Sequence, residues 1–398
     1  MIPESVGGCP YVGAMRVLHT SDWHVGRTFH GRDLLRDQEA VLTGLADLVV
    51  DERVGVVVVA GDLYDRAVPS GEAVQVCTRV LARIREAGAR IVITPGNHDS
   101  APRLGAFGEF AAAGGLHLRT RIGELDRPVL LADEHGPVAL YGIPYLEPEI
   151  ARQALDAREA RGHAGVLGEA MRRVRADLGG RGEGVRSVVL AHAFVTGGQG
   201  CESERAIAVG GVEQVPGSVF DGVDYVALGH LHGPQRLADH LRYSGSPLAY
   251  SFSEAGHRKS VLLVELGPAG LVGVEPRELP VPRRLGTLRG ALADLLADPA
   301  HDELTGHYLS VTLTDRVRPL DALRRLQERF PHAVRVDWQP DGGRPEVASR
   351  YPGAARGRPD EEVACCFLAD CRGEGPNQRE RALLDEAFAA VRRAEVHA

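Results

Sequence analysis

Short runs of β-branched, apolar residues alternate with amphipathic helical patterns through the first two thirds of the chain. The clearest run, VVVVA at 56–60, contains no polar residue and therefore suits a strand with both faces buried. Strands are predicted over 16–20, 56–60, 90–94, 138–142, 186–191, 225–229, 241–244 and 260–266, and helices over 34–53, 71–87, 151–178 and a short stretch after Pro102. This alternation predicts the α/β class, with buried central sheets between helices.

A proline-rich stretch, EPRELPVPRRLG from Glu275, interrupts this pattern and predicts a domain boundary near residue 282. We therefore expect a main domain over 15–282, a small α+β domain over 283–342, a linker over 343–360 and a helical hairpin over 361–398. Within the small domain, helices are expected over 288–298 and 320–330 and strands over 308–314 and 333–338. Residues 1–14 show no periodicity and are expected to be a dispensable extension. In the hairpin, Asn377 and Glu380 have the spacing of a reciprocal helix cap.

Several classes of protein are disfavoured by composition. The longest apolar run, at 54–60, is far shorter than the ~18 residues that span a bilayer, so we expect no membrane segment. Six cysteines in a chain of this length do not suggest a disulfide framework, so we expect reduced thiols and a cytoplasmic location. The single lysine, Lys259, follows Arg258 and not a glycine, so the chain has no P-loop for ATP. The net charge of −8 does not exclude a nucleic-acid partner, because metal-binding carboxylates count as negative until metals bind.

Five polar clusters directly follow predicted strands: Asp22-x-His24, Asp62 with Asp65 in GDLYDR, Asn97-His98-Asp99, His192, and His230-x-His232. Each alone has an ordinary explanation as a turn, a cap or a core histidine. Together they predict one site, because ligands of open α/β sheets bind at the carboxyl ends of strands. Carboxylate, amide and imidazole groups without cysteine suit Mn²⁺, Fe²⁺ or Zn²⁺. The seven candidate ligands, too many for one ion and about right for two, are Asp22, His24, Asp62, Asn97, His192, His230 and His232.

The motif series DxH, GDxxDR, GNHD, H and GHxH resembles that of the calcineurin-like metallophosphoesterase superfamily. The segments TSDWHVGRTFHGRDLLRDQ, FVTGGQGCESERAIAVGG, FDGVDYVALGHLHGPQ and YSGSPLAYSFSE resemble its SbcD branch, the nuclease subunits of bacterial SbcCD complexes. The likeness runs from Met15 to about Leu266. It implies a sandwich of two central sheets flanked by helices, followed by a capping domain that guides DNA. The arginines of that domain, Arg283, Arg284, Arg324 and Arg325, fit either contacts to phosphate or an ordinary solvent-exposed helix face.

The resemblance also implies a role for each candidate residue. Asp22, His24, Asp62 and His232 match the ligands of one metal ion, and Asp62, Asn97, His192 and His230 match those of a second, most typically both Mn²⁺. His98 matches the residue that protonates the leaving oxygen, and Asp65 matches the acid that orients it. A histidine, with an ordinary pKa near ~6.5, suits proton donation at neutral pH.

The implied function is a metal-dependent DNA nuclease, with double-strand exonuclease and single-strand or hairpin endonuclease activity in repair, recombination and replication. The implied assembly is a homodimer bound to an SbcC-like coiled-coil ATPase, which would bind the ATP and receive the C-terminal hairpin. One alternative is a metallophosphatase or phosphodiesterase acting on small nucleotides or phosphoproteins, which would not need the C-terminal domains. A second is a scaffold that binds DNA without cutting, which the complete ligand set and His98 disfavour.

Overall fold

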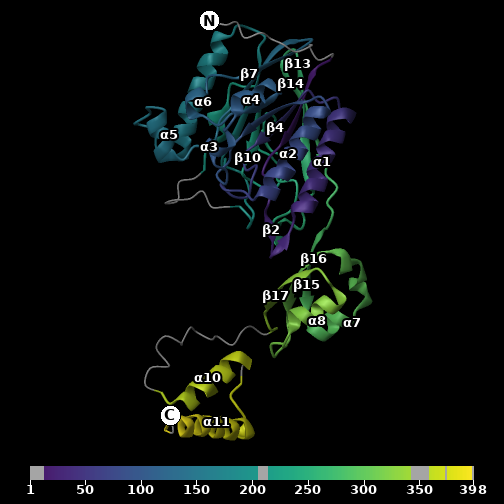
Figure 1. Ribbon diagram of the computed structural model, residues 1–398, viewed down its shortest axis with the longest axis vertical. Helices are drawn as coiled ribbons and strands as arrows, with labels where there is room; N and C mark the ends of the chain where they lie inside the picture. The colour runs from purple at the N-terminus through teal and green to yellow at the C-terminus, as the bar shows by residue number, and fades with distance from the viewer. Residues whose placement is uncertain (1–12, 205–213, 342–357, 373, 397–398) are drawn as a thin grey trace. The chain divides into compact units, whose positions relative to one another are not determined.

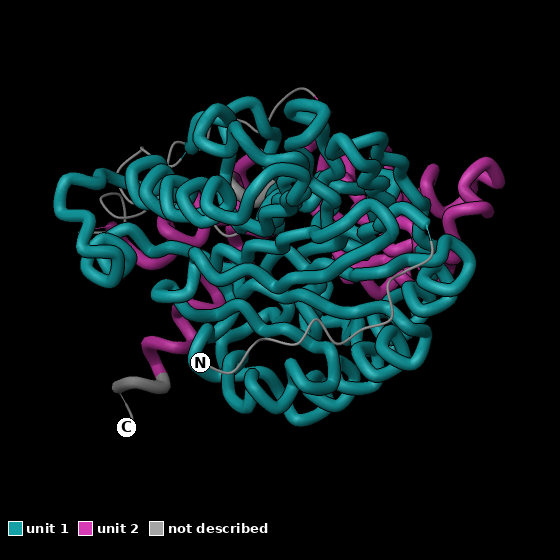
Figure 2. The backbone as a smooth tube through the Cα atoms, turned by 90° about the horizontal axis from the view of Figure 1, so that it is seen from above, with its two compact units in different colours: residues 1–282 teal, residues 283–398 magenta. Residues whose placement is uncertain are grey.

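A computed structural model describes residues 13–204, 214–341, 358–372 and 374–396. The chain divides into two compact units, residues 1–282 and residues 283–398 (Figure 2). The predictions for residues 1–12 and for most of the linker, and part of the segment FVTGGQGCESERAIAVGG, lie outside the described residues. None of the helices within the described ranges is long and apolar enough to cross a membrane.

The first sheet of unit 1 has the strand order β14-β13-β1-β4-β5-β6. Its strands are β1 (Met15–Thr20), β4 (Val56–Ala60), β5 (Arg90–Thr94), β6 (Leu116–Leu118), β13 (Ser260–Gly267) and β14 (Gly270–Glu278). β1 pairs parallel with β4 and antiparallel with β13, so the sheet is mixed. Every residue of β4 is buried, as its wholly apolar sequence predicts.

The second sheet has the order β11-β12-β10-β9-β8-β7. Its strands are β7 (Val129–Asp133), β8 (Gly136–Gly142), β9 (Arg186–His192), β10 (Tyr225–Gly229), β11 (Gln235–Arg236) and β12 (Leu241–Tyr243). The four central strands are parallel, and the strand at each edge is antiparallel to its neighbour. Apolar side chains from both sheets form one buried cluster, which includes Val17, Val56, Val58, Leu140, Val188 and Ala227.

Helices cover the outer faces of the two sheets, as Figures 1 and 2 show. On the first sheet, α1 (Leu35–Asp51) packs beside α2 (Gly71–Glu86), whose first turn is capped by the Ser70 hydroxyl, an acceptor for the Ala73 backbone N–H at 3.2 Å. On the second sheet, α6 (Gly162–Gly180) buries Val166, Ala170 and Val174 in a further apolar core. The predicted α/β architecture of two sheets flanked by helices is therefore confirmed.

Two helix predictions are wrong in their extent. The single helix expected over 151–178 is in fact α5 (Pro148–Ala154) followed by α6. The break between them contains left-handed backbone at Asp156, with φ of 49°, and α6 begins at a left-handed Gly162, with φ of 58°. The helix expected from residue 288 begins only at Leu292, as α7 (Leu292–Ala297), because residues 285–290 pair with a neighbouring strand instead. The short helix after Pro102 is the pair α3 (Ala101–Leu104) and α4 (Gly108–Ala113).

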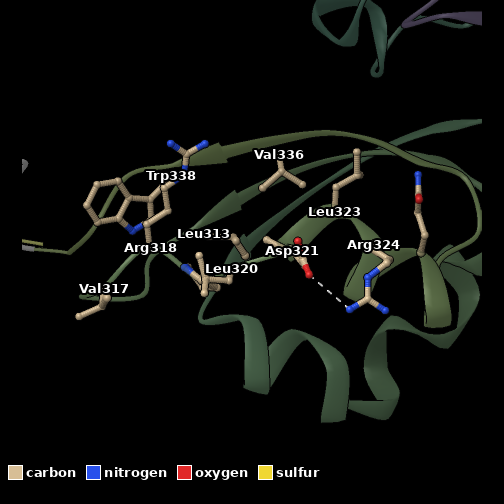
Figure 3. A pocket seen from close by; sticks show the side chains of 12 residues that line it. Leu313, Val317, Arg318, Leu320, Asp321, Leu323, Arg324, Val336 and Trp338 are labelled. Carbon is tan, nitrogen blue, oxygen red and sulfur yellow. Dashed lines mark hydrogen bonds and ion pairs between the residues drawn. The ribbon is translucent and has the colours of Figure 1, made fainter. Parts of the chain in front are cut away.

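Unit 2 contains a parallel sheet of β15 (Leu285–Gly290), β16 (Tyr308–Leu313) and β17 (Ala333–Trp338), with α7 and α8 (Ala322–Arg329) packed on it. An open cavity of about 880 Å³ beside α8 is lined by Val317, Leu320 and Trp338, among others (Figure 3). Arg324, at its rim, pairs with Asp321 at 3.4 Å, so its charge is already partly neutralised within the domain.

Two further helices, α10 (Asp360–Arg372) and α11 (Gln378–Val396), lie beyond the second gap in the described residues. The reciprocal cap predicted for α11 is present. The Asn377 side-chain oxygen accepts from the Glu380 N–H at 3.0 Å, and the Glu380 carboxylate accepts from the Asn377 N–H at 2.8 Å. The side chains of Phe367, Leu383 and Val391 on these helices are each more than half exposed.

Candidate metal centre

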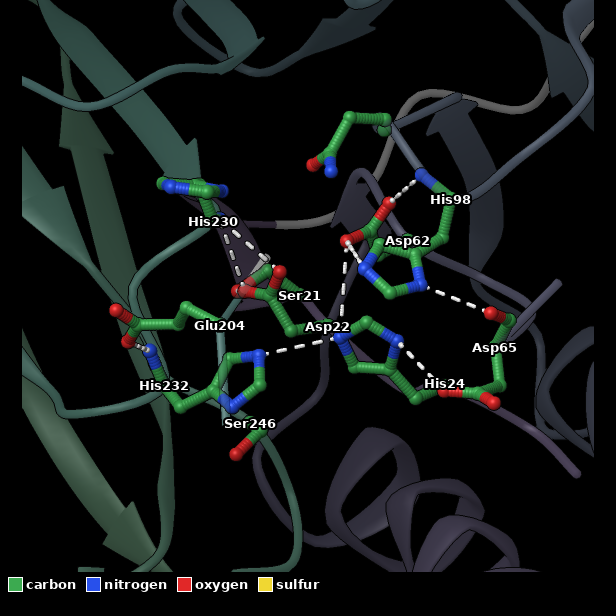
Figure 4. Close-up of polar contacts among 12 residues, drawn as sticks. Ser21, Asp22, His24, Asp62, Asp65, His98, Glu204, His230, His232 and Ser246 are labelled. Atoms are coloured by element: carbon green, nitrogen blue, oxygen red, sulfur yellow. Dashed lines mark hydrogen bonds and ion pairs between the residues drawn. The ribbon is translucent and has the colours of Figure 1, made fainter. Parts of the chain in front are cut away.

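The predicted site residues lie at the carboxyl ends of five strands. Asp22 and His24 follow β1, Asp62 follows β4, Asn97 and His98 follow β5, His192 ends β9, and His230 and His232 follow β10. β1, β4 and β5 are neighbours in the first sheet, and β9 and β10 are neighbours in the second. Because the carboxyl ends of parallel strands meet at one edge, the sandwich brings both sets together (Figure 4).

Six of these residues offer ligand atoms that converge. Within each of three groups, the atoms lie within 4.8 Å of one another: Asp22 with His24 and His232, His24 with Asp62 and His98, and Asp22 with Asp62 and His192. All six side chains are buried. Asn97 joins them through its side-chain oxygen, which lies 2.8 Å from Nε2 of His192.

The ring of His230 lies outside these three groups. Its backbone N–H donates to both carboxylate oxygens of Asp22, at 3.0 and 3.2 Å, and its ring faces that of His192 at a centroid distance of 5.3 Å. Figure 4 shows the His230 ring apart from His24, Asp62 and His98. A metal-ligating role for His230 stays a prediction.

The backbone of the site is held in unfavourable conformations. Asp22, His24, Asp62 and His230 have φ angles of 53°, 45°, 48° and 104°, in the region that L-residues avoid. Each such residue costs roughly 1–2 kcal/mol, and strain of this kind concentrates at functional sites. The two sheets also approach closely here: a Cβ atom at Gly229 would lie 1.7 Å from the Ala60 carbonyl oxygen, so only glycine fits before His230.

The hydrogen bonds of His192 leave one of its ring nitrogens as an acceptor that can bind a cation. Its Nδ1 lies 3.2 Å from the Ala60 carbonyl oxygen, which can only accept, so Nδ1 carries the proton. Its Nε2 is therefore an unprotonated acceptor, yet it faces the side-chain oxygen of Asn97 at 2.8 Å. Two lone pairs at this separation repel each other, and the repulsion is removed either by a cation beside them or by a turn of the Asn97 amide that presents its NH2 group.

A buried chain of hydrogen bonds holds His232. The Ser203 hydroxyl lies 2.7 Å from Nδ1 of His232 and donates to Glu254 at 2.5 Å, and Glu254 in turn pairs with Lys259 at 2.5 Å. Because the serine proton goes to the carboxylate, Nδ1 of His232 must be the donor, and its Nε2 is left free toward His24, 3.1 Å away. This arrangement is typical of a metal-ligating histidine with a second partner.

Sequence reasoning missed this chain of hydrogen bonds. Glu204, which also went unnoticed, accepts from the His232 backbone N–H at 2.7 Å. The signal in the sequence that could have pointed to it was the chain's single lysine. Lys259 is buried, donates to Glu254 and, at 2.9 Å, donates to the His232 carbonyl oxygen.

The contact between Asp65 and His98 differs from the one expected. Nδ1 of His98 lies 2.8 Å from the backbone carbonyl oxygen of Asp65, whereas the Asp65 carboxylate lies 3.7 Å from His24 and 3.6 Å from Arg27. In this structure Asp65 therefore contacts His98 through its backbone carbonyl group, and an orienting role for its carboxylate stays a prediction. His98 is also held by its backbone N–H, which donates to Asp62 at 2.9 Å.

The electrostatics of the site fit divalent cations. Burial, reinforced by the charge of Asp62, raises the pKa of Asp22 well above its ordinary value. Burial lowers the pKa values of His192 and His232 to about 4, so both imidazoles are neutral and able to ligate near pH 7. Nδ1 of His24 has no hydrogen-bond partner among the described residues. Two close buried carboxylates and neutral imidazoles, including Nε2 of His24 at 3.6 Å from Asp62, form a donor set that suits two such ions.

This fold and this buried Asp/His centre define a metal-dependent hydrolase of phosphoesters. The chain belongs to the calcineurin-like phosphoesterase family, whose model matches residues 15–234. Its activity is accordingly metal-dependent phosphoester hydrolysis at a buried two-metal site.

Solved structures that resemble the chain do so at low sequence identity. TT1561 of Thermus thermophilus is 14% identical, with 67% of this chain and 99% of that chain covered and a TM-score of 0.40. A dimetal phosphatase from Danio rerio is 14% identical, with 67% and 99% covered and a TM-score of 0.37. GAP50, the anchor in the inner membrane complex of Plasmodium, is 10% identical, with 83% and 98% covered and a TM-score of 0.38.

Proposed function

We propose that this phosphoesterase is a DNA nuclease of the SbcD type that works with two Mn²⁺ ions. The observation that carries the proposal is the buried convergence of Asp22, His24, Asp62, His192 and His232, with His98 beside them. Support for DNA as the substrate comes from the sequence between the motifs, which resembles the SbcD branch. Unit 2 adds support, because a hydrolase of small molecules has no need of it.

In the proposed mechanism, Asp22, His24, Asp62 and His232 would hold one ion, and Asp62, Asn97, His192 and His230 would hold the other. Two divalent ions in such a site polarise phosphoryl oxygens and lower the pKa of the attacking water. The protein supplies the proton for the leaving oxygen. The Asp65 carbonyl group fixes Nδ1 of His98, which turns Nε2 toward the site, 4.0 Å from Asp62. A proton on Nε2 is thus placed for transfer to the leaving oxygen.

The proposal includes two macromolecular partners besides a second copy of the chain. One is DNA, guided by the small domain at 283–342. The other is an SbcC-like coiled-coil ATPase, because the chain has no P-loop and any ATP dependence must come from a partner. The exposed apolar side chains of α10 and α11 provide a surface for such a partner.

The deciding experiment compares two substrates with Mn²⁺ present. The purified chain is incubated with single-stranded, hairpin and double-stranded DNA, analysed on gels, and in parallel with bis(nitrophenyl) phosphate. A nuclease cuts DNA and also hydrolyses the small diester, and the Asp62→Asn variant loses both activities. Hydrolysis of the small diester or of nucleotides without any cutting of DNA would instead establish the metallophosphatase or phosphodiesterase alternative.

A further inference from the structure

A cavity of about 390 Å³ in unit 1 is lined by three arginines, Arg236, Arg242 and Arg258, and by a single carboxylate, Glu278. Its remaining lining is largely apolar and includes Tyr243, Leu262 and Pro276. The cavity is lined by residues of the outermost two strands at one side of each sheet, β11 and β12 in the second sheet and β13 and β14 in the first. The lining therefore carries an excess of positive charge, whereas the net charge of the chain is −8.

The cavity adjoins the metal centre. Pro234 and Gln235, which line it, follow the predicted ligand His232 after one intervening residue. β13 runs antiparallel to β1, so its first residue, Ser260, lies beside the end of β1, the end that Asp22 follows in the chain. Lys259, next to Arg258 in the chain, donates to the His232 carbonyl oxygen at 2.9 Å. Arg258 is therefore linked to the metal centre through its neighbour Lys259, which contacts the predicted ligand His232.

The positive charges in the cavity are incompletely neutralised by the protein. Arg236 and Arg242 are cross-strand partners in the β11–β12 pair, an arrangement in which like charges destabilise a sheet. Asp239 pairs with Arg236 but offers Arg242 only its backbone carbonyl oxygen, at 3.0 Å. Within the described ranges, neither Arg242 nor Arg258 has a carboxylate partner. An anion bound in the cavity would remove this repulsion.

The segment that joins the metal centre to the cavity has no side chain of its own. A Cβ atom at Gly233 would lie 2.9 Å from Cε1 of His257, so a larger residue there would displace this imidazole. His257 is exposed and precedes Arg258 in the chain. Its imidazole therefore lies beside Gly233, the residue between His232 and the cavity-lining Pro234.

We propose that this cavity binds a backbone phosphate of the strand whose neighbouring phosphodiester lies at the metal centre. The proposal rests on the proposed DNA nuclease function and adds a second contact for the same strand. Guanidinium groups suit this role because they stay charged and donate two parallel hydrogen bonds to phosphate oxygens. The apolar part of the lining leaves room for the sugar attached to that phosphate.

The test uses the full chain with Mn²⁺ and a short phosphorothioate-linked single strand, chosen because sulfur substitution slows hydrolysis. Its dissociation constant is measured over a range of salt concentrations for the wild type and for Arg258→Ala and Arg258→Glu. Arg258→Ala is expected to weaken binding about 5- to 20-fold and to reduce the salt slope by about 0.7, the value for one phosphate contact on a single strand. Arg258→Glu is expected to weaken binding further.

Arg83→Ala is the matched control, because Arg83 is an exposed arginine on α2, outside the cavity, with no side-chain partner among the residues described. If Arg258→Ala and Arg83→Ala bind alike while the wild type binds and cuts DNA, the proposed subsite is wrong and the proposed function stands. If the wild type hydrolyses the small diester but neither binds nor cuts DNA, the proposed function itself fails. If inorganic phosphate displaces the strand at concentrations near the strand's own dissociation constant, the cavity is a site for a free anion and the strand assignment is overturned.

Discussion

His98 and His232 lie close together in the buried site but are held in different ways. Substitution of each should therefore have a different effect on metal binding and on cutting. His98 is fixed by the backbone of Asp65, whereas His232 presents an unprotonated Nε2 to the centre. We expect His98→Ala to keep both Mn²⁺ ions while cutting falls ~10²–10⁴-fold, the range for loss of a general acid. We expect His232→Ala to lose Mn²⁺, measured by elemental analysis after gel filtration. Equal Mn²⁺ content in the wild type and the His232 variant would refute its role as a ligand.

Ser203 is expected to act as a positioning residue for His232. Its hydroxyl joins Nδ1 of His232 to the Glu254–Lys259 pair, so Ser203→Ala leaves a buried N–H without its acceptor and the ring without a fixed tautomer. We expect Mn²⁺ affinity to fall about 10- to 100-fold, the usual effect of removing such a partner. The measurement is a Mn²⁺ titration, with nitrogen chemical shifts of the imidazole reporting the tautomer.

The matched control for this substitution is Ser203→Thr, which keeps a hydroxyl at the same position. We expect the threonine variant to recover most of the Mn²⁺ affinity and the wild-type tautomer. A loss that is the same for alanine and threonine would mean that the site responds to packing at residue 203 and not to the hydrogen bond.

The buried carboxyls make Mn²⁺ binding depend on pH. Burial and the charge of Asp62 raise the pKa of Asp22 well above its ordinary value, so a proton competes with metal for this carboxylate at higher pH than at an ordinary aspartate. His192 and His232 add nothing in this range, because burial lowers their pKa values to about 4. Raising the pH from 6 to 8 should therefore strengthen Mn²⁺ binding, by up to about tenfold per pH unit for each proton released. Calorimetry in buffers of different ionisation enthalpy measures that release, and affinity independent of pH would contradict this account.

Residue types and their positions after strands were enough to predict the convergence of most of the site. Asp22, His24, Asp62, His98, His192 and His232 come together because the carboxyl ends of parallel strands share an edge. Hydrogen-bond partners supplied by distant segments could not be predicted in this way. Ser203 and Glu254 meet only after folding, and no spacing in the sequence relates them to His232.

At the scale of elements, the contact between β4 and β10 depends on a missing side chain. Gly229 ends β10, and a Cβ atom there would overlap the carbonyl oxygen of Ala60 at the end of β4. We expect Gly229→Ala to lower the free energy of unfolding by about 2–3 kcal/mol and to weaken Mn²⁺ binding, because the sheets must separate beside the site. Denaturant unfolding of the metal-free protein measures the first effect.

Gly168→Ala is the matched control for this substitution. Gly168 lies within α6, and a Cβ atom there meets nothing within 4 Å. The same added methyl group should therefore stabilise the protein by roughly 0.5–1 kcal/mol, because alanine favours the helix. If both variants were destabilised equally, close approach of the sheets would not be the cause at Gly229.

Helices and strands were predicted best where the hydrophobic pattern of the sequence is clearest. All ten predicted strands are present within two residues of their expected bounds, because most of them are apolar runs that fold into the buried parts of the sheets. β7 and β14 were missed, since their burial is mixed and their partners are antiparallel neighbours that sequence does not reveal. The last residues of β15, at 288–290, were predicted as helix. They form a strand because their pairing with β16, which is distant in the sequence, overrides the local preference.

At the scale of the whole molecule, unit 2 continues beyond its small sheet domain into α10 and α11. These helices contact each other, and Arg392 on α11 pairs with Glu361 on α10. Phe367, Leu383 and Val391 nevertheless remain 55%, 59% and 53% exposed. Apolar side chains that a helical pair leaves exposed in this way are commonly covered by a partner. Under the proposed function, that partner is the coiled-coil ATPase, which would receive a helix face of this kind.

A chain that ends at Asp341 should therefore keep Mn²⁺-dependent cutting of single strands, because every predicted ligand lies in unit 1. It should lose both co-purification with the ATPase and any stimulation by ATP, since the chain has no P-loop of its own. Leu383→Asp in the full chain should have the same effect through one exposed apolar contact, whereas Arg381→Ala, an exposed polar neighbour on α11, should not. Pull-down yield and ATP-dependent cutting are the two measurements. If the shortened chain recovers the ATPase at full yield, the partner docks elsewhere and the exposed face of α10 and α11 has another role.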